Sequence, residues 1–291
     1  MNIKHLAIIG MILSLVACKG EQTIYNAENY ILFAQKQHTF GVIDNEEWFE
    51  IPISATRTSD HARNIGVEII YSESDTIEGL HFVVENNTVT IPAGKLTTAL
   101  RIRGIAENIA VGSNPKIVLN LVIDDEQIWD VYGTRSEVHL QRCCPFNIDN
   151  FAGYAKITST WLMQYMNTDT SIVETEVDRE NKSVIIKNMF YEGYDIIVSL
   201  DNSNRLEPRV NISEQVLGST GEAFGTIYGN GKLMMAEPMG YTSYFGTCEN
   251  FMVLYTTMYV DGVGTVGTYV NILEWISEEE AKQMSLHYKL E

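Results

Sequence analysis

The sequence of 291 residues is poor in basic side chains, in cysteine and in long apolar runs. Twenty lysine and arginine residues stand against 38 aspartate and glutamate residues, for a formal net charge of −18 at pH 7. Because nucleic-acid affinity comes largely from lysine and arginine on phosphates, this balance argues against a nucleic-acid partner. After residue 17, no segment is apolar for the roughly 20 residues that a membrane helix needs, so no spanning helix is expected.

Cysteine is scarce, and its four positions allow more than one redox state. They are Cys18, Cys143, Cys144 and Cys248. The adjacent pair is not expected to form its own disulfide, because the peptide that joins the two residues would be strained. Two arrangements remain open: Cys248 bridged to one of the pair with one thiol left over, or buried free thiols. Without a CxxC spacing or a nearby histidine pair, no metal site is expected.

Signatures of catalysis are also missing. The histidines form no HExxH motif, no GxSxG elbow occurs, and nothing selects a glycosidase pair among the 38 acidic residues. The GxGxxG pattern at Gly262–Gly267 precedes a β-branched stretch instead of a helix, so it predicts a hairpin turn. His81 and His139 fall in expected strands and are assigned structural roles. We therefore expect no enzyme, no catalytic residue and no cofactor.

An export signal stands at the start of the chain. A short polar start with Lys4 is followed by an apolar run over residues 6–15 and by small residues before Cys18. This order is typical of a secretory signal, here over residues 1–17. The segment Leu15–Cys18 resembles the lipobox of bacterial lipoproteins. The resemblance implies that Cys18 is lipidated and becomes the mature N-terminus.

Residues 18–29 are mostly polar and predict a lipidated tether. Acyl chains on Cys18 would hold the protein at a membrane, each buried CH₂ contributing about 0.8 kcal/mol. In bacterial lipoproteins, a residue such as Lys19 after the cysteine, instead of aspartate, favours the outer membrane. We therefore expect a lipid-anchored outer-membrane protein exposed at the cell surface, with a periplasm-facing orientation as the alternative.

Residues 30–141 show short β-rich runs separated by turn residues. The expected strands are Tyr30–Phe33, Trp48–Ile53, Val67–Tyr71, Leu80–Val84, Thr88–Ile91, Ala99–Arg103, Ile117–Ile123 and Glu137–Leu140. Pro52 indicates an edge strand, and Asn86-Asn87 indicates a turn between paired strands. Strands of this length with little helical periodicity predict a β-sandwich.

The stretch Thr88–Gly94, followed by an alternating strand, resembles the Calx-beta domain and its bacterial surface relatives. The resemblance covers Tyr30 to Leu140 and implies an immunoglobulin-like sandwich. Members of that family with calcium sites carry acidic residues before this motif and after the next strand. Here the segments 80–82 and 105–107 occupy those places, so no calcium site is carried over. The acidic turn Asp124–Glu126 is expected to be a solvated loop.

A junction over residues 141–150, broken by Pro145, separates the sandwich from a second domain over residues 150–276. Its expected strands are Tyr154–Ile157, Trp161–Tyr165, Ile172–Val177, Ser183–Ile186, Tyr194–Leu200, Arg209–Ile212, Ala223–Tyr228, Leu233–Ala236, Phe251–Val260 and Thr265–Trp275. They predict an up-and-down antiparallel meander that closes into a barrel or leaves protected edges. The tail, residues 277–291, has acids first and bases last, which favours a short helix.

The segments Asn150–Tyr154 and Ile212–Gln215 resemble the lipocalin-like C-terminal domain of Gram-negative surface lipoproteins. Those proteins are often found beside SusC/SusD-type polysaccharide-uptake systems. The resemblance implies a location and an architecture more than a chemistry.

The stretch Pro238–Gly246 has loop composition yet carries three aromatic rings. They belong to Tyr241, Tyr244 and Phe245. Rings presented on a loop can stack on sugar faces or grip a protein while the tyrosine hydroxyls stay wet. The alternative is a loop folded over the barrel mouth. Tyr191 and Tyr194, around a turn glycine, form a second group of candidate ligand-binding residues.

Together these features predict a non-enzymatic, lipid-anchored protein of the cell surface that binds glycan or peptide in nutrient capture. The alternative is a structural or assembly lipoprotein whose partner is another envelope protein. In both cases the lipid anchor at Cys18 attaches the protein to the membrane.

Overall fold

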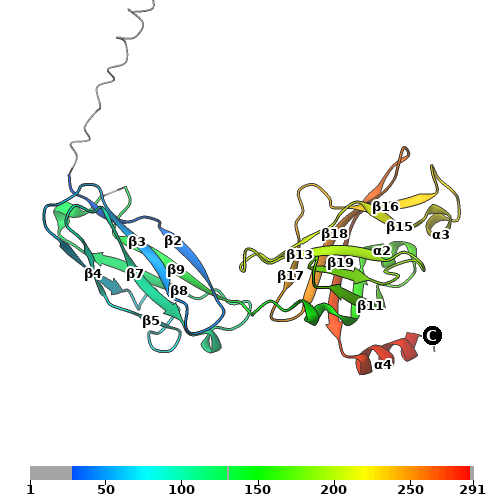
Figure 1. Ribbon diagram of the computed structural model, residues 1–291, viewed down its shortest axis with the longest axis horizontal. Helices are drawn as coiled ribbons and strands as arrows, with labels where there is room; N and C mark the ends of the chain where they lie inside the picture. Colours follow the sequence, from blue (N-terminus) through cyan, green and yellow to red (C-terminus); the bar gives the residue numbers. More distant parts are fainter. Residues whose placement is uncertain (1–27, 130, 289–291) are drawn as a thin grey trace, which may run out of the picture.

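The computed structural model describes residues 28–129 and 131–288 (Figure 1). The predicted signal segment and the lipidation site at Cys18 lie outside the described residues. Two packed sheets, called the sandwich below, are followed by a closed antiparallel barrel, as Figure 1 shows side by side. The predicted all-β class, a sandwich followed by a barrel, is confirmed. No helix within the described ranges is long and apolar enough to cross a membrane.

The sandwich pairs the sheet β1-β3-β7-β5 with the sheet β2-β9-β8-β4-β6. The first sheet contains β1 (Ile31–Phe33), β3 (Phe49–Ala55), β7 (Thr97–Gly104) and β5 (Phe82–Val84). The second contains β2 (Gln37–Val42), β9 (Arg135–Arg142), β8 (Lys116–Val122), β4 (Arg63–Ile69) and β6 (Thr88–Ile91). Short 3₁₀ turns lie at Ala106–Asn108 and Asp125–Gln127. Alternate residues such as Ile51 and Ile53 of β3 face the core, as the period of a half-buried strand requires.

Two expectations for the sandwich are corrected. The strand that contains Pro52 is not an edge, because β3 lies between β1 and β7. Its proline is tolerated because β1 ends at Phe33, opposite Ile53, and the one contact beyond it runs from Ala34 N to Pro52 O, which needs no N–H on the proline. The strands around Asn86-Asn87 do not form a hairpin, since β5 pairs with β7 while β6 pairs with β4 in the other sheet.

Eight of the described strands close into the barrel, in the order β10-β11-β12-β13-β14-β17-β18-β19, with β19 returning to β10. Their bounds are β10 (Gly153–Ser159), β11 (Thr170–Asp178), β12 (Ser183–Ile186), β13 (Ile196–Asp201), β14 (Arg209–Asn211), β17 (Ser243–Gly246), β18 (Phe251–Val260) and β19 (Gly264–Ile276). The hairpin of β15 (Gln215–Ser219) and β16 (Lys232–Ala236) branches from β18. The predicted turn at the glycine-rich stretch is confirmed, because β18 and β19 pair as a hairpin around Gly262.

Two expected strands are not strands: Trp161–Tyr165 is helical, and Ala223–Tyr228 consists of the end of a helix and the turn that follows it. The helix α2 covers Thr160–Tyr165 and α3 covers Thr220–Phe224, each beginning after a serine whose hydroxyl accepts from backbone N–H groups. Serine is a preferred N-cap, and Gly225 ends α3 in the left-handed conformation at φ 69°. A 3₁₀ turn covers Ile148–Phe151. The expected terminal helix is present as α4, Glu278–Tyr288.

The inside of the barrel is filled by side chains. Buried rings pack there with aliphatic residues from most of the barrel strands. Trp161 from α2 contacts Tyr269 edge to face at 5.0 Å between ring centroids, and Phe151 contacts Phe245 in the same way at 5.5 Å. An eight-stranded ring has an interior that side chains of this size can fill.

A side chain completes the ring where one strand is too short. The three residues of β14 pair with Ser199–Asp201, which leaves the first half of β13 without a partner on that side. The Gln215 amide takes this place: its Nε2 donates to Ile197 O and its Oε1 accepts from Ile197 N, each at 2.9 Å. Gln215 belongs to the segment that carries the lipocalin-like resemblance.

Candidate binding cleft between the sandwich and the barrel

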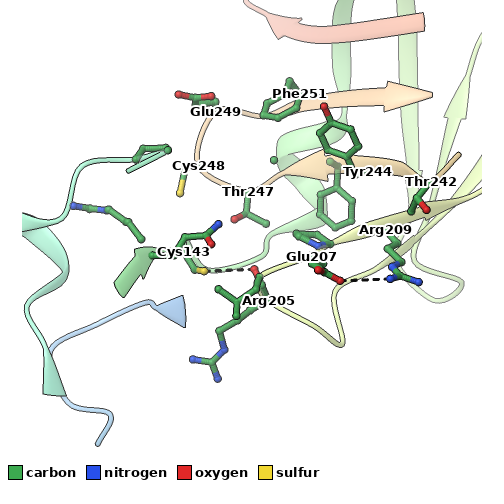
Figure 2. A pocket seen from close by; sticks show the side chains of 18 residues that line it. Cys143, Arg205, Glu207, Arg209, Thr242, Tyr244, Thr247, Cys248, Glu249 and Phe251 are labelled. Atoms are coloured by element: carbon green, nitrogen blue, oxygen red, sulfur yellow. Dashed lines mark hydrogen bonds and ion pairs between the residues drawn. The ribbon is translucent and has the colours of Figure 1, made fainter. Parts of the chain in front are cut away.

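A cleft of about 560 Å³ lies where the sandwich meets the barrel (Figure 2). The sandwich side contributes the loop residues Val111 and Gly112 and the end of β9. The barrel side contributes the segment 205–209 and the segment from Thr242 to Phe251. Both strands of the barrel wall, β17 and β18, therefore reach the cleft with the turn that joins them.

Arg205 joins the two domains at the bottom of the cleft. Its Nη1 donates to Gly41 O at 3.3 Å and to a Glu47 carboxylate oxygen at 2.5 Å. The Cys143 thiol donates to Arg205 O at 3.4 Å. A Cβ on Gly41 would lie 2.8 Å from both Arg205 Cδ and Cys143 Sγ. The domains thus meet without space for a larger residue at this point.

The interdomain segment is also held covalently. A disulfide joins Cys144, just after β9, to Cys248 in the turn between β17 and β18. Cys143 is buried and free, and burial raises the pKa of its thiol. Of the two arrangements left open by the sequence, the bridged one with one spare thiol is the one observed. No cluster of three or more His, Cys, Asp and Glu side chains within the described residues could hold a metal ion.

The barrel wall of the cleft carries an aromatic pair. Tyr244 on β17 and Phe251 on β18 contact edge to face, with ring centroids 6.0 Å apart. Gly246 makes this possible, because a Cβ at that position would overlap the Phe251 ring. Arg209 lies directly opposite Tyr244 across β14 and β17, and both residues face outward. Its guanidinium contacts the exposed Glu207 carboxylate at 3.4 Å.

A second aromatic pair lies next to the first on the same outer wall. Tyr241 packs on Tyr255 of β18 with ring centroids 5.2 Å apart. Tyr244 is opposite Val253, so Phe251 and Tyr255 are its diagonal neighbours, at about 7–8 Å. We call Tyr241, Tyr244, Phe251 and Tyr255 the ring platform. Tyr241 is 54% exposed and Tyr244 is 41% exposed, so both rings are accessible to a ligand.

The other sequence-predicted site residues direct their rings into the core of the barrel, although Phe245 borders the cleft. Phe245 is 2% exposed and packs inside the barrel, because its neighbour Tyr244 takes the outward position on the strand. The expectation that Phe245 is displayed on a loop is therefore corrected, and the segment Ser243–Gly246 is a strand. Tyr191 is buried against Gly218 and the core, and Tyr194 is partly buried against the same core. Neither of these two residues lines the cleft.

Phe251 and Tyr255 were not predicted as site residues. Both lie in an expected strand, and outward positions at 251 and 255 alternate with core positions at Met252 and Leu254. That alternation is readable in sequence only once the inward face is known. It is obscured here because three consecutive residues, 252–254, are all buried.

The carboxylates of the cleft do not form an evident catalytic pair. Glu207 and Glu249 both line it, but Glu207 lies beside Arg209. Figure 2 draws Glu249 on the other side of the cleft, beyond Thr247. The lining is otherwise aromatic, hydroxyl and guanidinium in character, which suits recognition by stacking and hydrogen bonding.

Residues 131–287 match the model of a family described as "Domain of unknown function (DUF4984)". The chain belongs to this family. The match covers more than half of the chain, from just before β9 into α4, and so contains the barrel wall of the cleft. The family description names no catalytic activity. No curated protein sequence matches the chain.

Solved structures with similar folds are remote in sequence. The apo form of the Calx CBD1 domain is 16% identical and covers 40% of this chain and 98% of its own, with a TM-score of 0.33. A candidate carbohydrate-binding protein from Bacteroides ovatus is 12% identical and covers 83% of this chain and 67% of its own, with a TM-score of 0.32. A Bacteroides ovatus protein of unknown function is 9% identical and covers 84% and 89%, with a TM-score of 0.37. Likenesses of this size decide neither a ligand nor an activity.

Proposed function

We propose that this protein is a lipid-anchored, non-enzymatic binding protein of the cell surface that captures glycan on the ring platform. The observation that carries the proposal is the pair of adjacent aromatic contacts on the outer barrel wall, beside the cleft. Aromatic faces stack on the apolar faces of sugar rings, and the tyrosine hydroxyls remain free to bond to water or to sugar hydroxyls. Arg209 and Thr242 add donors at the edge of the same surface.

The spacing of the rings favours an oligosaccharide over a single sugar. Phe251 and Tyr255 are four residues apart on one strand, which corresponds to about 13 Å at the usual rise per residue. One sugar ring cannot cover both pairs at that separation. A chain of several sugars that runs along the wall would contact Tyr244 and Phe251 at the cleft and Tyr241 and Tyr255 beyond it.

The anchoring part of the proposal is lipidation at Cys18 in the outer membrane, with the barrel facing outward. Its support is the lipobox-like segment and the lysine that follows it. A surface protein of this kind would serve nutrient capture, beside an uptake system of the SusC/SusD type. The net charge of −18 fits neutral glycans better than highly acidic ones, since like charges repel.

The test is a glycan-array screen of the soluble form that starts after Cys18, run beside the double variant Tyr241→Ala/Tyr244→Ala. We expect binding to a set of oligosaccharides that the double variant loses. The matched control is Tyr228→Ala, an exposed tyrosine of the same domain outside the cleft, which should bind as the unchanged protein does. Binding that survives in the double variant would place the site elsewhere. Absence of binding to every glycan would contradict the proposal.

A second candidate function is docking to another envelope protein, and one surface favours it. Ile227 and Val263 are exposed large apolar residues that both lie beside the same turn, near Gly231 and Gly229 respectively. Exposed apolar clusters often mark interaction sites. If no glycan on the array binds, a pull-down from envelope extract tests this alternative. The double variant Ile227→Asp/Val263→Asp serves as the comparison. The alternative requires that this variant no longer capture the protein that the unchanged chain captures.

A further inference from the structure

The chain enters the sandwich at the end that points away from the barrel (Figure 1). Val122 at the end of β8 pairs with Gly66 in the middle of β4, so β8 ends toward the start of β4, and Ile31 at the start of β1 pairs with Ala55 at the end of β3. The β3–β4 loop and the β8–β9 loop therefore lie at the end where β1 begins. The other end of the sandwich, where β9 stops at Arg142, leads into the barrel.

An aromatic stack covers this N-terminal end. Tyr30 lies parallel to Trp129, with ring centroids 5.7 Å apart and 12° between the planes. Tyr132 packs on Trp129 from its own loop at 4.6 Å. Trp129 is thus held between a residue at the start of β1 and a residue before β9. The stack belongs to no core cluster of the sandwich.

Several large side chains at this end are open to solvent. Val131 is 67% exposed, Tyr132 is 44% exposed and Leu96 is 43% exposed. Leu96 lies at the same end because its carbonyl accepts from Ala55 N at the end of β3. We call Tyr30, Leu96, Trp129, Val131 and Tyr132 the N-terminal end face. Tryptophan and tyrosine with this mixed character are the residues that concentrate at membrane–water interfaces.

The length of chain before the end face limits what can cover it. Tyr30 is twelve residues after Cys18. Even fully extended, twelve residues span only about 40 Å, and a relaxed chain spans less. An acyl chain on Cys18 would therefore keep this end of the sandwich next to the bilayer. Exposed Arg57 and Lys95 lie at this end together with Asp60 and the acidic turn Asp124–Glu126, so acidic side chains outnumber basic ones there. A zwitterionic lipid surface fits that balance better than an anionic one.

We infer that the N-terminal end face rests in the interfacial layer of the bilayer that carries the Cys18 anchor. The inference rests on the lipidation proposed above. With this contact the sandwich stands on the membrane as a spacer, and the barrel and its ring platform are held on the far side, toward solvent. The aromatic residues fix an orientation that attachment through Cys18 alone would leave free.

The experiment uses the full lipidated chain in vesicles of phosphatidylcholine that carries bromine near the glycerol end of its acyl chains. Bromine quenches tryptophan fluorescence only at short range, and the chain has four tryptophans. We expect bromolipid to quench part of the emission and Trp129→Phe to remove most of that quenching. The matched control is Trp48→Phe, at the barrel end of the sandwich beside Glu47 and its ion pair with Arg205, which should keep the quenching.

Anchoring and end-face contact give separate readouts. Vesicle flotation of the same samples, with Cys18→Ser as the unlipidated form, reports the anchor. Protein that floats with vesicles but is not quenched overturns the end-face inference and leaves the proposed anchor intact. Protein that does not float overturns both. Quenching that is unchanged in Trp129→Phe also overturns the inference, because another tryptophan would then be the one in contact.

Discussion

The sandwich and the barrel are built from similar strands but place their aromatic rings differently. The sandwich core is almost entirely isoleucine, leucine and valine, with Phe33 and Phe82 as its buried rings. The barrel core holds several rings, among them Trp161, Phe151 and Phe245. Two packed sheets leave a thin layer that aliphatic side chains fill, whereas a closed ring of strands leaves a wider interior.

This difference teaches how to interpret aromatic residues in the second domain. Since the barrel needs rings inside, its aromatic content alone does not indicate a binding surface. Only the direction of each side chain separates packing from recognition. Tyr244 and Phe245 are consecutive, yet the first faces the cleft and the second fills the core.

The largest expected effect is on stability, and it tests which side chains of β17 point into the barrel and which point outward. Phe245→Ala should lower the free energy of unfolding by about 3–5 kcal/mol, because it leaves a cavity among buried rings. Tyr244→Ala should lower it by less than about 1 kcal/mol, since the ring is largely at the surface. Urea unfolding of the soluble form measures both. Similar losses for the two variants would contradict the assignment of their directions.

The next effect concerns the junction. The double variant Cys144→Ser/Cys248→Ser should lose about 2–4 kcal/mol of stability, because the bridge closes a sequence separation of 104 residues. Cys143→Ser is the matched control: it removes a free thiol with one contact, to Arg205 O, and should cost less. Denaturation without reductant distinguishes them. An equal or larger loss in the control would indicate that Cys143 is the bridged residue.

A smaller effect is expected where Gln215 completes the barrel. Gln215→Ala removes the two hydrogen bonds to the Ile197 backbone, which is partly solvent-exposed, and should cost about 1–2 kcal/mol. Gln215→Glu is an informative partner, because it keeps the acceptor for Ile197 N but loses the donor to Ile197 O. Amide exchange at Ile197 should rise in Gln215→Ala and stay slower in Gln215→Glu, which keeps the acceptor for Ile197 N. Unchanged exchange would show that the ring is held by other contacts.

The smallest effect is a pH dependence in the barrel. Burial raises the pKa of Tyr191 to about 12, above its usual value near 10 in an unfolded chain. Because the folded pKa is the higher one, the contribution is complete below about pH 10 and is lost as the pH rises toward 12. Tyr191→Phe should therefore make the alkaline decline in stability shallower. Thermal melts between pH 9 and pH 12 measure this, and identical slopes would contradict it.

Much of the architecture could be predicted because alternation and turn residues are local signals. Strands such as Ile117–Ile123 were expected within a residue of β8. The strands expected at Trp161–Tyr165 and Ala223–Tyr228 are absent because serine caps start a helix at each place, and Gly225 ends the second helix in a turn. The pairing expected across Asn86-Asn87 was wrong because long-range packing decides which sheet each strand joins.

The candidate site was only partly predictable for a similar reason. Tyr241 and Tyr244 stood out because they follow turn residues, but the strand β17 that displays Tyr244 was taken as a loop. Phe251 and Tyr255 join them only through the register of β17 on β18, which no single segment encodes. The choice between Cys143 and Cys144 likewise depends on which side chain faces the barrel.

The most direct test of the account is a titration of the best oligosaccharide from the array against the soluble form and three variants. Tyr244→Ala and Tyr255→Ala should each weaken binding about tenfold or more, which corresponds to the loss of about 1.4 kcal/mol per ring contact. Tyr228→Ala should leave the dissociation constant unchanged. If all three variants bind as tightly as the unchanged protein, the ring platform is not the binding surface and the proposed function is wrong.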